Sequence, residues 1–240
     1  MSGWEAAGDV SVQTAAFGTQ PKEGSYHALL TTFHSIYGGQ QPWEPALPLS
    51  GNDPVESQAI ESFLGLPAQF LEALSKYRSG DEQGGVTSGS AIKQQFQARA
   101  GSSLTVHYNF LTDGGWGNAN DFSFVSLVSE AGLLGFIIAG VESPDRESDT
   151  VLARETGYRR FTLAVPFTGR YTLGIGVMEM RDNWSGSALC VDKITMTRSP
   201  LFPFHLRKNG SGVISYAGLK REPRHVHAER PDDVGRRRAR

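Results

Sequence analysis

Residues 104–110 read LTVHYNF, and in this stretch apolar side chains alternate with polar ones. Leu104, Val106, Tyr108 and Phe110 would share one face of a β-strand, and the residues between them would share the other. The same period of two recurs at 161–167 and 171–177. This alternation is typical of strands that turn one face to a core and the other to solvent.

Further short strands are expected on both sides of this stretch. They are predicted at 9–14, 27–32, 122–128, 133–138 and 188–197, and a period of two begins near Ser90. The chain has 240 residues, of which 28 are glycine and 39% are hydrophobic, and this suits one large domain with many tight turns. We therefore predict an all-β, antiparallel jelly-roll β-sandwich over residues 1–204.

A short helical insert is expected at about 53–77. Asp53 can serve as N-cap, Pro54 suits the first helical position, and Glu56 can complete a capping box. Gly65 and Pro67 would end the first helix, and a second follows. The expected apolar faces are Val55, Ala59 and Phe63 in the first helix and Phe70, Leu71, Leu74 and Tyr77 in the second. Residues 79–89 are expected to form a polar loop.

The end of the chain differs from the rest in charge. From His205 to Arg240 there are ten Lys and Arg against four Asp and Glu, whereas the preceding residues hold thirteen against twenty-one. We predict a basic, disordered tail at 205–240. The acidic body argues against nucleic-acid binding by the folded domain, because phosphates need clustered Lys or Arg.

Targeting signals are not apparent in the sequence. Met1-Ser-Gly-Trp4 has neither a basic nor an apolar segment of a signal peptide, and no stretch approaches the ~18 apolar residues that span a bilayer. Taken literally, these features predict a chain without a membrane span that is not exported.

Signatures of catalysis are also not apparent. The chain has no nucleophile elbow, no zinc-protease motif and no phosphate-binding loop. Cys190, the single cysteine, is expected to be a buried small hydrophobic residue, and the histidines suggest no constellation. Carboxylates are plentiful, so a glycosidase pair such as Glu179 with Asp113 stays open.

Several ordered segments resemble a group of bacterial exported proteins. They include Gly3-Trp4, Ala28-Leu-Leu-Thr-Thr32, Tyr108-Asn-Phe-Leu-Thr-Asp113, Tyr171-Thr-Leu-Gly-Ile-Gly-Val177 and Ser187-Ala-Leu-Cys-Val-Asp192. The group is common in cyanobacteria and often carries a PEP-CTERM sorting signal. The resemblance implies a galactose-binding-like jelly roll, an extracellular or cell-surface setting, and frequently a structural calcium.

This chain departs from the group in three places. The acidic-aromatic segment that usually precedes the Gly-Trp pair and often supplies calcium ligands is missing. Lys193 stands where the group usually has Asn, and a basic tail replaces the sorting helix. The first departure bears directly on calcium.

Calcium is the expected cofactor. It needs six to eight oxygen ligands from loops or strand ends. Asp192 is the leading candidate, because the alternation in 188–197 changes phase there and predicts a β-bulge. Asp113 and Asp121 flank a Gly-rich loop and could form a second site. The alternative is that these residues are ordinary turn-capping Asp residues.

Two tryptophans in polar loops are the candidate ligand-binding residues. Trp116 and Trp184 could stack on a sugar ring, with Asn118 and Asn183 supplying hydrogen bonds. The alternative is that each Trp folds over the sandwich edge as a lid.

These features predict a non-catalytic module for binding or surface display, with a glycan or cell-surface matrix as partner and calcium as a stabiliser. A structural or adhesive domain that packs against protein is the first alternative. A glycoside hydrolase on the same fold is the second, and it requires two carboxylates at roughly 5–9.5 Å in one groove.

Overall fold

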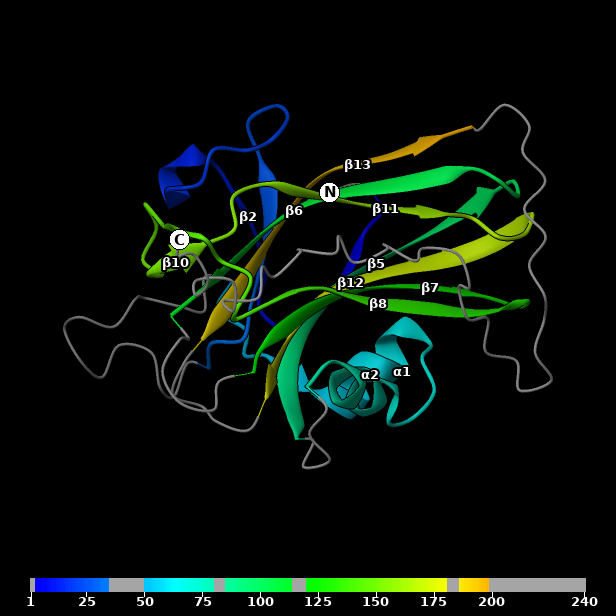
Figure 1. Ribbon diagram of the computed structural model, residues 1–240, viewed down its shortest axis with the longest axis horizontal. Helices are drawn as coiled ribbons and strands as arrows, with labels where there is room; N and C mark the ends of the chain where they lie inside the picture. Colours follow the sequence, from blue (N-terminus) through cyan, green and yellow to red (C-terminus); the bar gives the residue numbers. More distant parts are fainter. Residues whose placement is uncertain (1–2, 35–49, 80–84, 114–119, 181–185, 199–240) are drawn as a thin grey trace, which may run out of the picture.

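Two antiparallel β-sheets pack face to face in the computed structural model, which describes residues 3–34, 50–79, 85–113, 120–180 and 186–198 (Figure 1). The first, sheet A, runs in the order β1-β5-β12-β7-β8, with β4 also paired to β5. Its strands are β1 (Glu5–Ala7), β4 (Val55–Glu56), β5 (Val86–Ala98), β7 (Phe122–Ser129), β8 (Gly132–Gly140) and β12 (Gly169–Met180).

The second, sheet B, runs in the order β2-β3-β13-β6, and both β10 and β11 pair with the far edge of β6. Its strands are β2 (Val10–Gln13), β3 (His27–Thr31), β6 (Ser103–Thr112), β9 (Arg146–Glu147), β10 (Arg154–Glu155), β11 (Arg159–Ala164) and β13 (Ser187–Thr197). A 3-10 turn, η1 (Ala15–Phe17), follows β2.

The connections between the main strands form a jelly roll. Strands β3, β13, β6 and β11 lie opposite β5, β12, β7 and β8. Every connection among these eight crosses from one sheet to the other except the β7–β8 hairpin. This order confirms the predicted antiparallel jelly-roll sandwich.

The alternation in the sequence places the core as expected. Val106, Phe110, Ile175 and Leu189 are buried between the two sheets, whereas His107 lies on the outer face of sheet B and is half-buried. The predicted bulge is also present, because the pairing of β13 with β6 changes register between Asp192 and Thr195. Cys190 is buried, as expected.

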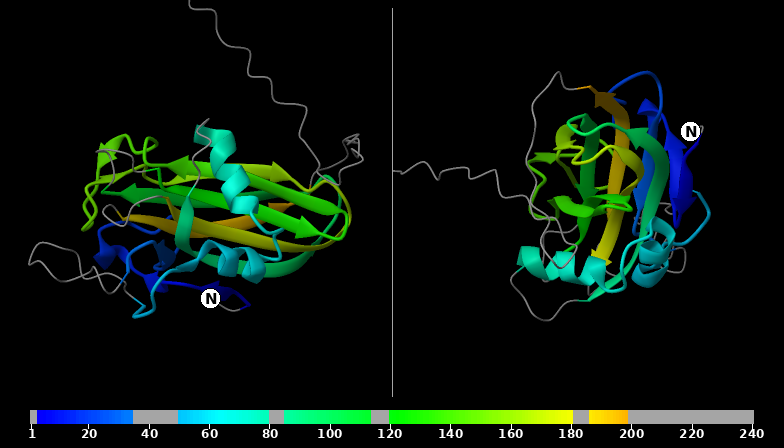
Figure 2. Two further views of the ribbon diagram at one scale, coloured as in Figure 1. Left: turned by 90° about the horizontal axis from the view of Figure 1, so that it is seen from below. Right: turned by 90° about the vertical axis from the view of Figure 1, so that its right-hand side faces the viewer.

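Two helices cover the outer face of sheet A (Figures 1 and 2). Helix α1 (Ser57–Leu64) packs against β5 and β12, and helix α2 (Phe70–Ser79) packs against β8 and β5. Glycines in the sheet allow this close approach: a Cβ at Gly174 would lie 2.9 Å from Leu64 Cδ2, and one at Gly135 would overlap the Phe70 ring. A second apolar core, separate from the one between the sheets, fills this layer.

The predicted start of the first helix is wrong, and its predicted apolar face is correct in part. Asp53 does not cap α1; Glu56 stands at the N-cap position and its side chain makes no capping hydrogen bond. The physical reason is that Val55 pairs with Gly89 of β5, which keeps the chain extended up to Glu56. Ile60, Glu61 and Leu64 are the buried residues of α1. Of the predicted apolar face, Val55 and Phe63 are half-buried against the same core, and Ala59 is exposed.

Buried Glu61 is a feature that the helical pattern did not predict. Its carboxylate accepts hydrogen bonds from the backbone N–H groups of Gln69 and Leu71, at 3.0 and 2.9 Å. An anion at these first-turn donors stabilises a helix N-terminus. One helix therefore caps the next, and Gly65, with φ of 71°, makes the turn between them. In α2, Leu71 is buried and Phe70 and Leu74 are half-buried, as expected, while the Tyr77 side chain lies outside the described residues.

The predicted polar loop at 79–89 is too long. Strand β5 already begins at Val86, and Ser88 is buried in it. The tail at 205–240 lies outside the described residues, so it stays a prediction. Within the described part of the chain, no helix is long and apolar enough to cross a membrane.

Candidate functional site

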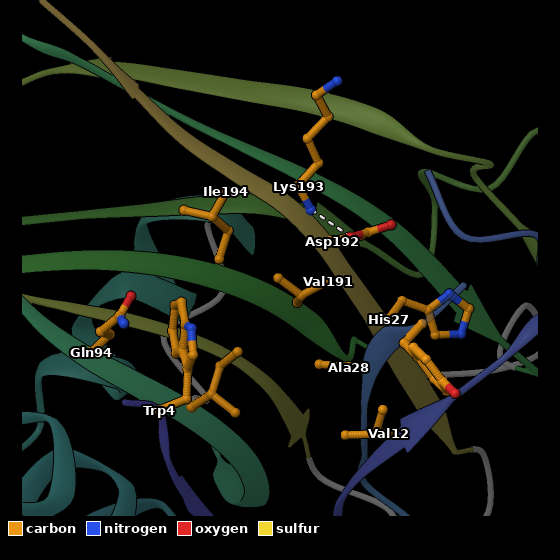
Figure 3. Close-up of a pocket in the computed structure, with 11 residues that line it drawn as sticks. Trp4, Val12, His27, Ala28, Gln94, Val191, Asp192, Lys193 and Ile194 are labelled. Atoms are coloured by element: carbon orange, nitrogen blue, oxygen red, sulfur yellow. Dashed lines mark hydrogen bonds between the residues drawn. The ribbon is translucent and has the colours of Figure 1, made fainter. Parts of the chain in front are cut away.

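A groove of about 480 Å³ opens on the side of the sandwich where the edge strands β1 and β2 lie (Figure 3). Sheet A contributes Ile92 and Gln94, and Trp4, directly before β1, also lines the groove. Sheet B contributes Val12 of β2, His27 and Ala28 of β3, and Val191, Asp192, Lys193 and Ile194 of β13, together with Tyr26 just before β3.

The groove exists because two strands on this side, β1 at the edge of sheet A and β3 next to the edge of sheet B, pair with their neighbours over short stretches. Strand β3 pairs with β13 only at Ala188–Val191, and β1 pairs with β5 only at 91–93. After Val191 in β13 and after Lys93 in β5, neither strand has a partner on this side among the strands that the structure describes. The sandwich therefore stays open here, and the core residues Ala28, Ile92 and Val191 line its floor.

The groove carries aromatic surface that is accessible from solvent. Tyr26 is 64% exposed and Val12 is 51% exposed. Trp4 is half-buried and packs against the core between the sheets. In Figure 3, Trp4 stands beside Gln94 on one side of the groove, and Val12 and His27 lie on the other. Exposed aromatic and apolar side chains gathered in a hollow mark a binding surface more often than scattered ones do.

Polar groups converge on the rim of the groove at the β13 bulge. Asp192 accepts hydrogen bonds from the backbone N–H groups of Lys193 and Glu23, at 2.6 and 2.9 Å. Lys193 adopts a φ of 43°, which is uncommon for a residue with a side chain. Its ammonium group lies 3.5 Å from the Glu23 carboxylate. The bulge therefore adds two charged residues to the lining, and in Figure 3 the Lys193 side chain extends away from Trp4 and Gln94.

A buried polar cluster lies next to the groove, on the outer face of sheet B. His27 Nδ1 lies 2.8 Å from the Tyr158 hydroxyl, and His27 Nε2 lies 3.8 Å from Cys190 Sγ. Desolvation lowers the pKa of His27, and the nearby Asp192 carboxylate partly opposes this. Burial raises the pKa of Cys190, and Glu155 and Asp192 raise it further. The thiol is therefore neutral, which removes Cys190 as a nucleophile.

The residues predicted to hold calcium lie in three separate places. Asp113 follows β6, and its Oδ1 accepts a 2.6 Å hydrogen bond from Ala153 N; desolvation raises its pKa. Asp121 precedes β7, is fully buried, and accepts a 3.1 Å bond from Met180 N. Asp192 lies in β13, with both carboxylate oxygens bonded to backbone N–H groups. Among the described residues, no three His, Cys, Asp or Glu side chains form a group that could hold a metal. Calcium at these positions stays a prediction.

The predicted ligand-binding residues Trp116, Asn118, Asn183 and Trp184 lie outside the described residues. The residues that flank their two segments are nevertheless close together. Asp113 N donates to Gly186 O at 3.2 Å, and Met180 N donates to Asp121 Oδ1 at 3.1 Å. The two segments therefore start and end side by side at one end of the sandwich.

The groove does not contain the glycosidase pair considered from the sequence. Its lining includes one carboxylate, Asp192, and neither Glu179 nor Asp113 belongs to it. Glu179 is buried in β12, where its carboxylate accepts a 2.9 Å hydrogen bond from Ser88 Oγ. Two carboxylates across a substrate are required for that chemistry.

Sequence reasoning missed most of this site. Trp4 entered only as part of a family resemblance, and Tyr26, His27 and Gln94 were not singled out. Two signals were available in the sequence. One is the glycine before Trp4, and the other is the position of Tyr26, an aromatic residue directly before a predicted strand. Neither reveals that residues near positions 4, 26, 94 and 192 meet.

Comparison with solved structures returns β-sandwich proteins at low similarity. The structure of TmCBM61 in complex with β-1,4-galactotriose matches with a TM-score of 0.38 and 12% identity, over 82% of this chain and 90% of that one. A structure of carbohydrate-binding modules from the β-sandwich superfamily matches with a TM-score of 0.38 and 11% identity, over 82% and 58%. The enzymatically active domain of bacteriophage CBA120 tailspike protein 4 gives 0.37 and 9%, over 81% and 19%.

Similarity at this level transfers neither a ligand nor an activity to this chain. No family model matches the sequence, and no curated protein matches it. The resemblance to PEP-CTERM-associated exported proteins therefore stays a prediction.

Proposed function

We propose that this protein is a non-catalytic module that binds a saccharide in the groove beside β1 and β2. One observation carries the proposal: a single open groove combines the aromatic rings of Trp4 and Tyr26 with the polar groups of Gln94, Asp192 and Lys193. Ligand sites typically join apolar and aromatic walls to a few placed polar groups.

The chemistry of the groove suits a sugar. The face of a pyranose ring that carries C–H bonds packs well on an aromatic ring, and its hydroxyl groups both donate and accept hydrogen bonds. Tyr26, at 64% exposure, offers a ring that the fold itself does not bury. The amide, carboxylate and ammonium groups at the rim supply both acceptors and donors. The single carboxylate in the lining supports binding without hydrolysis.

A glycan array probed with the full chain, followed by calorimetry on the best ligands, tests this proposal. We expect Tyr26→Ala to weaken binding about tenfold, a loss of roughly 1.4 kcal/mol, without lowering the melting temperature, because the side chain is largely exposed. Trp4→Phe should weaken binding and remove any ligand-dependent change that Trp4 contributes to fluorescence.

Val151→Ala is the matched control, since Val151 is 55% exposed and lies outside the groove. It should bind as the wild type does. The proposal is overturned if no glycan binds, or if Tyr26→Ala and Trp4→Phe bind as tightly as the control.

A second candidate function is that of a structural or adhesive domain that binds another protein chain, and one observation favours it. Strand β8 reads GLLGFIIAG, without a charged residue, and stands at the end of sheet A. Edge strands of this kind can pair with another chain, and charges usually guard against it. Sedimentation analysis over a range of concentrations would show self-association if β8 pairs in this way, and a monomer throughout would count against it.

Calcium stabilisation and extracellular display extend the proposal along the family resemblance. If calcium binds the folded chain, millimolar calcium raises the melting temperature and EDTA reverses the shift. Asp192→Asn and Asp121→Asn variants would then identify which carboxylate contributes. An unchanged melting temperature would contradict the calcium prediction and leave the saccharide groove intact.

A further inference from the structure

A second hollow, of about 510 Å³, lies at the end of the sandwich where β5 ends and β12 begins. Its lining includes three arginines, Arg99, Arg170 and Arg198, together with Gln97, Thr168 and Met196. Among the described residues that line it there is no carboxylate. We call this hollow the arginine cleft.

The three arginines differ from other cations of the fold. Arg159 pairs with Asp145 at 2.9 Å, and Lys93 pairs with Glu5 at 3.3 Å. Among the described residues, by contrast, none of the cleft arginines forms an ion pair. All three are exposed. Like charges in one hollow repel each other, so their grouping does not stabilise the fold, and an anionic ligand would offset the repulsion.

The cleft and the saccharide groove are both lined by residues of β5 and β13, at successive positions along these strands. On β5, Gln94 lines the groove and Gln97 lines the cleft. On β13, Ile194 lines the groove and Met196 lines the cleft. Three residues of a strand span about 10 Å. An oligosaccharide of a few units can therefore reach from one hollow to the other.

We propose that the groove and the arginine cleft together bind an acidic polysaccharide, with the carboxylates of its uronic acid units on Arg99, Arg170 and Arg198. This inference rests on the proposed saccharide-binding function. The guanidinium fork matches a carboxylate with two parallel hydrogen bonds. Gln97 and Thr168 add groups for neighbouring hydroxyls.

The observations favour a uronate over a nucleic acid. The lining of the cleft, as far as the described residues show it, includes no aromatic side chain on which a base could stack. The chain before His205 carries thirteen basic and twenty-one acidic residues, so its net charge opposes a ligand with one charge at every short step. A polysaccharide has a lower charge density than a nucleic acid duplex and carries many hydroxyl groups, so it suits both hollows.

Binding of matched oligosaccharides to the full chain tests the inference. The probes are oligogalacturonate, oligoglucuronate and oligomannuronate, each beside its carboxyl-reduced neutral counterpart, in about 0.15 M salt to screen non-specific attraction. We expect at least one acid form to bind more tightly than its neutral form. Arg99→Ala/Arg170→Ala should remove that preference, weakening the acid form about tenfold and leaving the neutral form unchanged.

Two further variants separate geometry from charge. Lys22→Ala/Arg160→Ala removes the same charge from exposed positions outside both hollows, and it should retain the preference. Arg99→Lys/Arg170→Lys retains the charge but loses the guanidinium fork, and it should lose most of the preference. The basic tail is present in every variant, so it cancels in the comparison.

The outcomes divide cleanly. If neutral oligosaccharides bind through Tyr26 but no acid form binds better, the arginine cleft is overturned and the saccharide groove stands. If no form of any oligosaccharide binds, both fail. Equal losses in the Lys22→Ala/Arg160→Ala control, or equal binding of dextran sulfate, would show non-specific attraction to polyanions and would also overturn the cleft.

Discussion

The outer face of sheet A and the open side between β5 and β13 differ in whether other elements cover them. Helices α1 and α2 cover the first, and their apolar side chains fill the space that Gly135 and Gly174 leave. The second has no covering element among the described residues, and two short strands leave it hollow. Binding at a sheet face would require displacement of packed apolar side chains, whereas binding at the side requires none.

Removal of a helical anchor should give the largest effect on the covered face. Leu71, in the first turn of α2, is fully buried against sheet A. Leu71→Ala is expected to lower the free energy of unfolding by about 2–5 kcal/mol, through lost transfer free energy and the cavity that remains. Chemical denaturation measures the change. Saccharide binding at temperatures where the variant is folded should not change, and a loss of binding there would mean that the helices support the groove.

The close approach of helix and sheet predicts a smaller, reversible effect. Gly135→Ala would place a methyl group against the Phe70 ring and cost about 1–3 kcal/mol. Phe70→Leu removes the ring atoms that the methyl group meets, so Gly135→Ala should cost much less in that background. Denaturation of the four proteins of this cycle gives the coupling directly. Independent, additive effects would contradict the packing explanation.

Patterns in the sequence predict the covered parts better than the open side. Strict alternation at Leu104, Val106 and Phe110 places the core, and the change of phase at Asp192 places the bulge, because both follow from the local period of a strand. The start of α1 is missed because a distant pairing, Val55 with Gly89, overrides the local capping signal of Asp53.

The two hollows could not be predicted in this way. The groove depends on where β1 and β3 end relative to their neighbours, and it joins Trp4 to residues near position 192. In the arginine cleft, Arg99 and Arg170 come from opposite strands of one pair and Arg198 from the other sheet. The local periodicity of a strand does not indicate which distant residues come together. The loop tryptophans that the sequence suggested as ligand-binding residues lie outside the described residues.

His27 marks the border between the open groove and the packed outer face of sheet B, and this predicts a pH effect. Its pKa is lowered by desolvation, so the unfolded chain binds a proton more readily than the folded one. The associated stability is present above the unfolded pKa of about 6.5 and is lost as pH falls through the lower folded pKa.

A variant can show whether His27 causes this dependence of the unfolding free energy on pH. In His27→Gln, the fall in unfolding free energy between about pH 7 and pH 5 should be shallower than in the wild type. Val151→Ala, an exposed change that alters no titratable group, serves as control and should retain the wild-type slope. Parallel slopes in His27→Gln and wild type would show that other groups dominate.

The smallest expected change in unfolding free energy is at Lys193. Its backbone conformation favours glycine, whereas saccharide binding is proposed to use its side chain. A side chain at φ of 43° costs free energy that glycine does not pay in the folded state, although glycine gains freedom in the unfolded chain. Its exposed contact with Glu23 contributes little. Lys193→Gly should therefore raise the unfolding free energy by about 0–1 kcal/mol, while it weakens saccharide binding because the rim ammonium group is gone.

Lys193→Ala separates these two contributions. It loses the same ammonium group but retains a Cβ at the strained position, so it should bind as weakly as Lys193→Gly without any gain in stability. If both variants bind as the wild type does, the strained residue at the bulge has no part in the groove. If both lose stability equally, the ion pair with Glu23 outweighs the backbone conformation, and the open side is then held by its rim contacts as well as by its short strands.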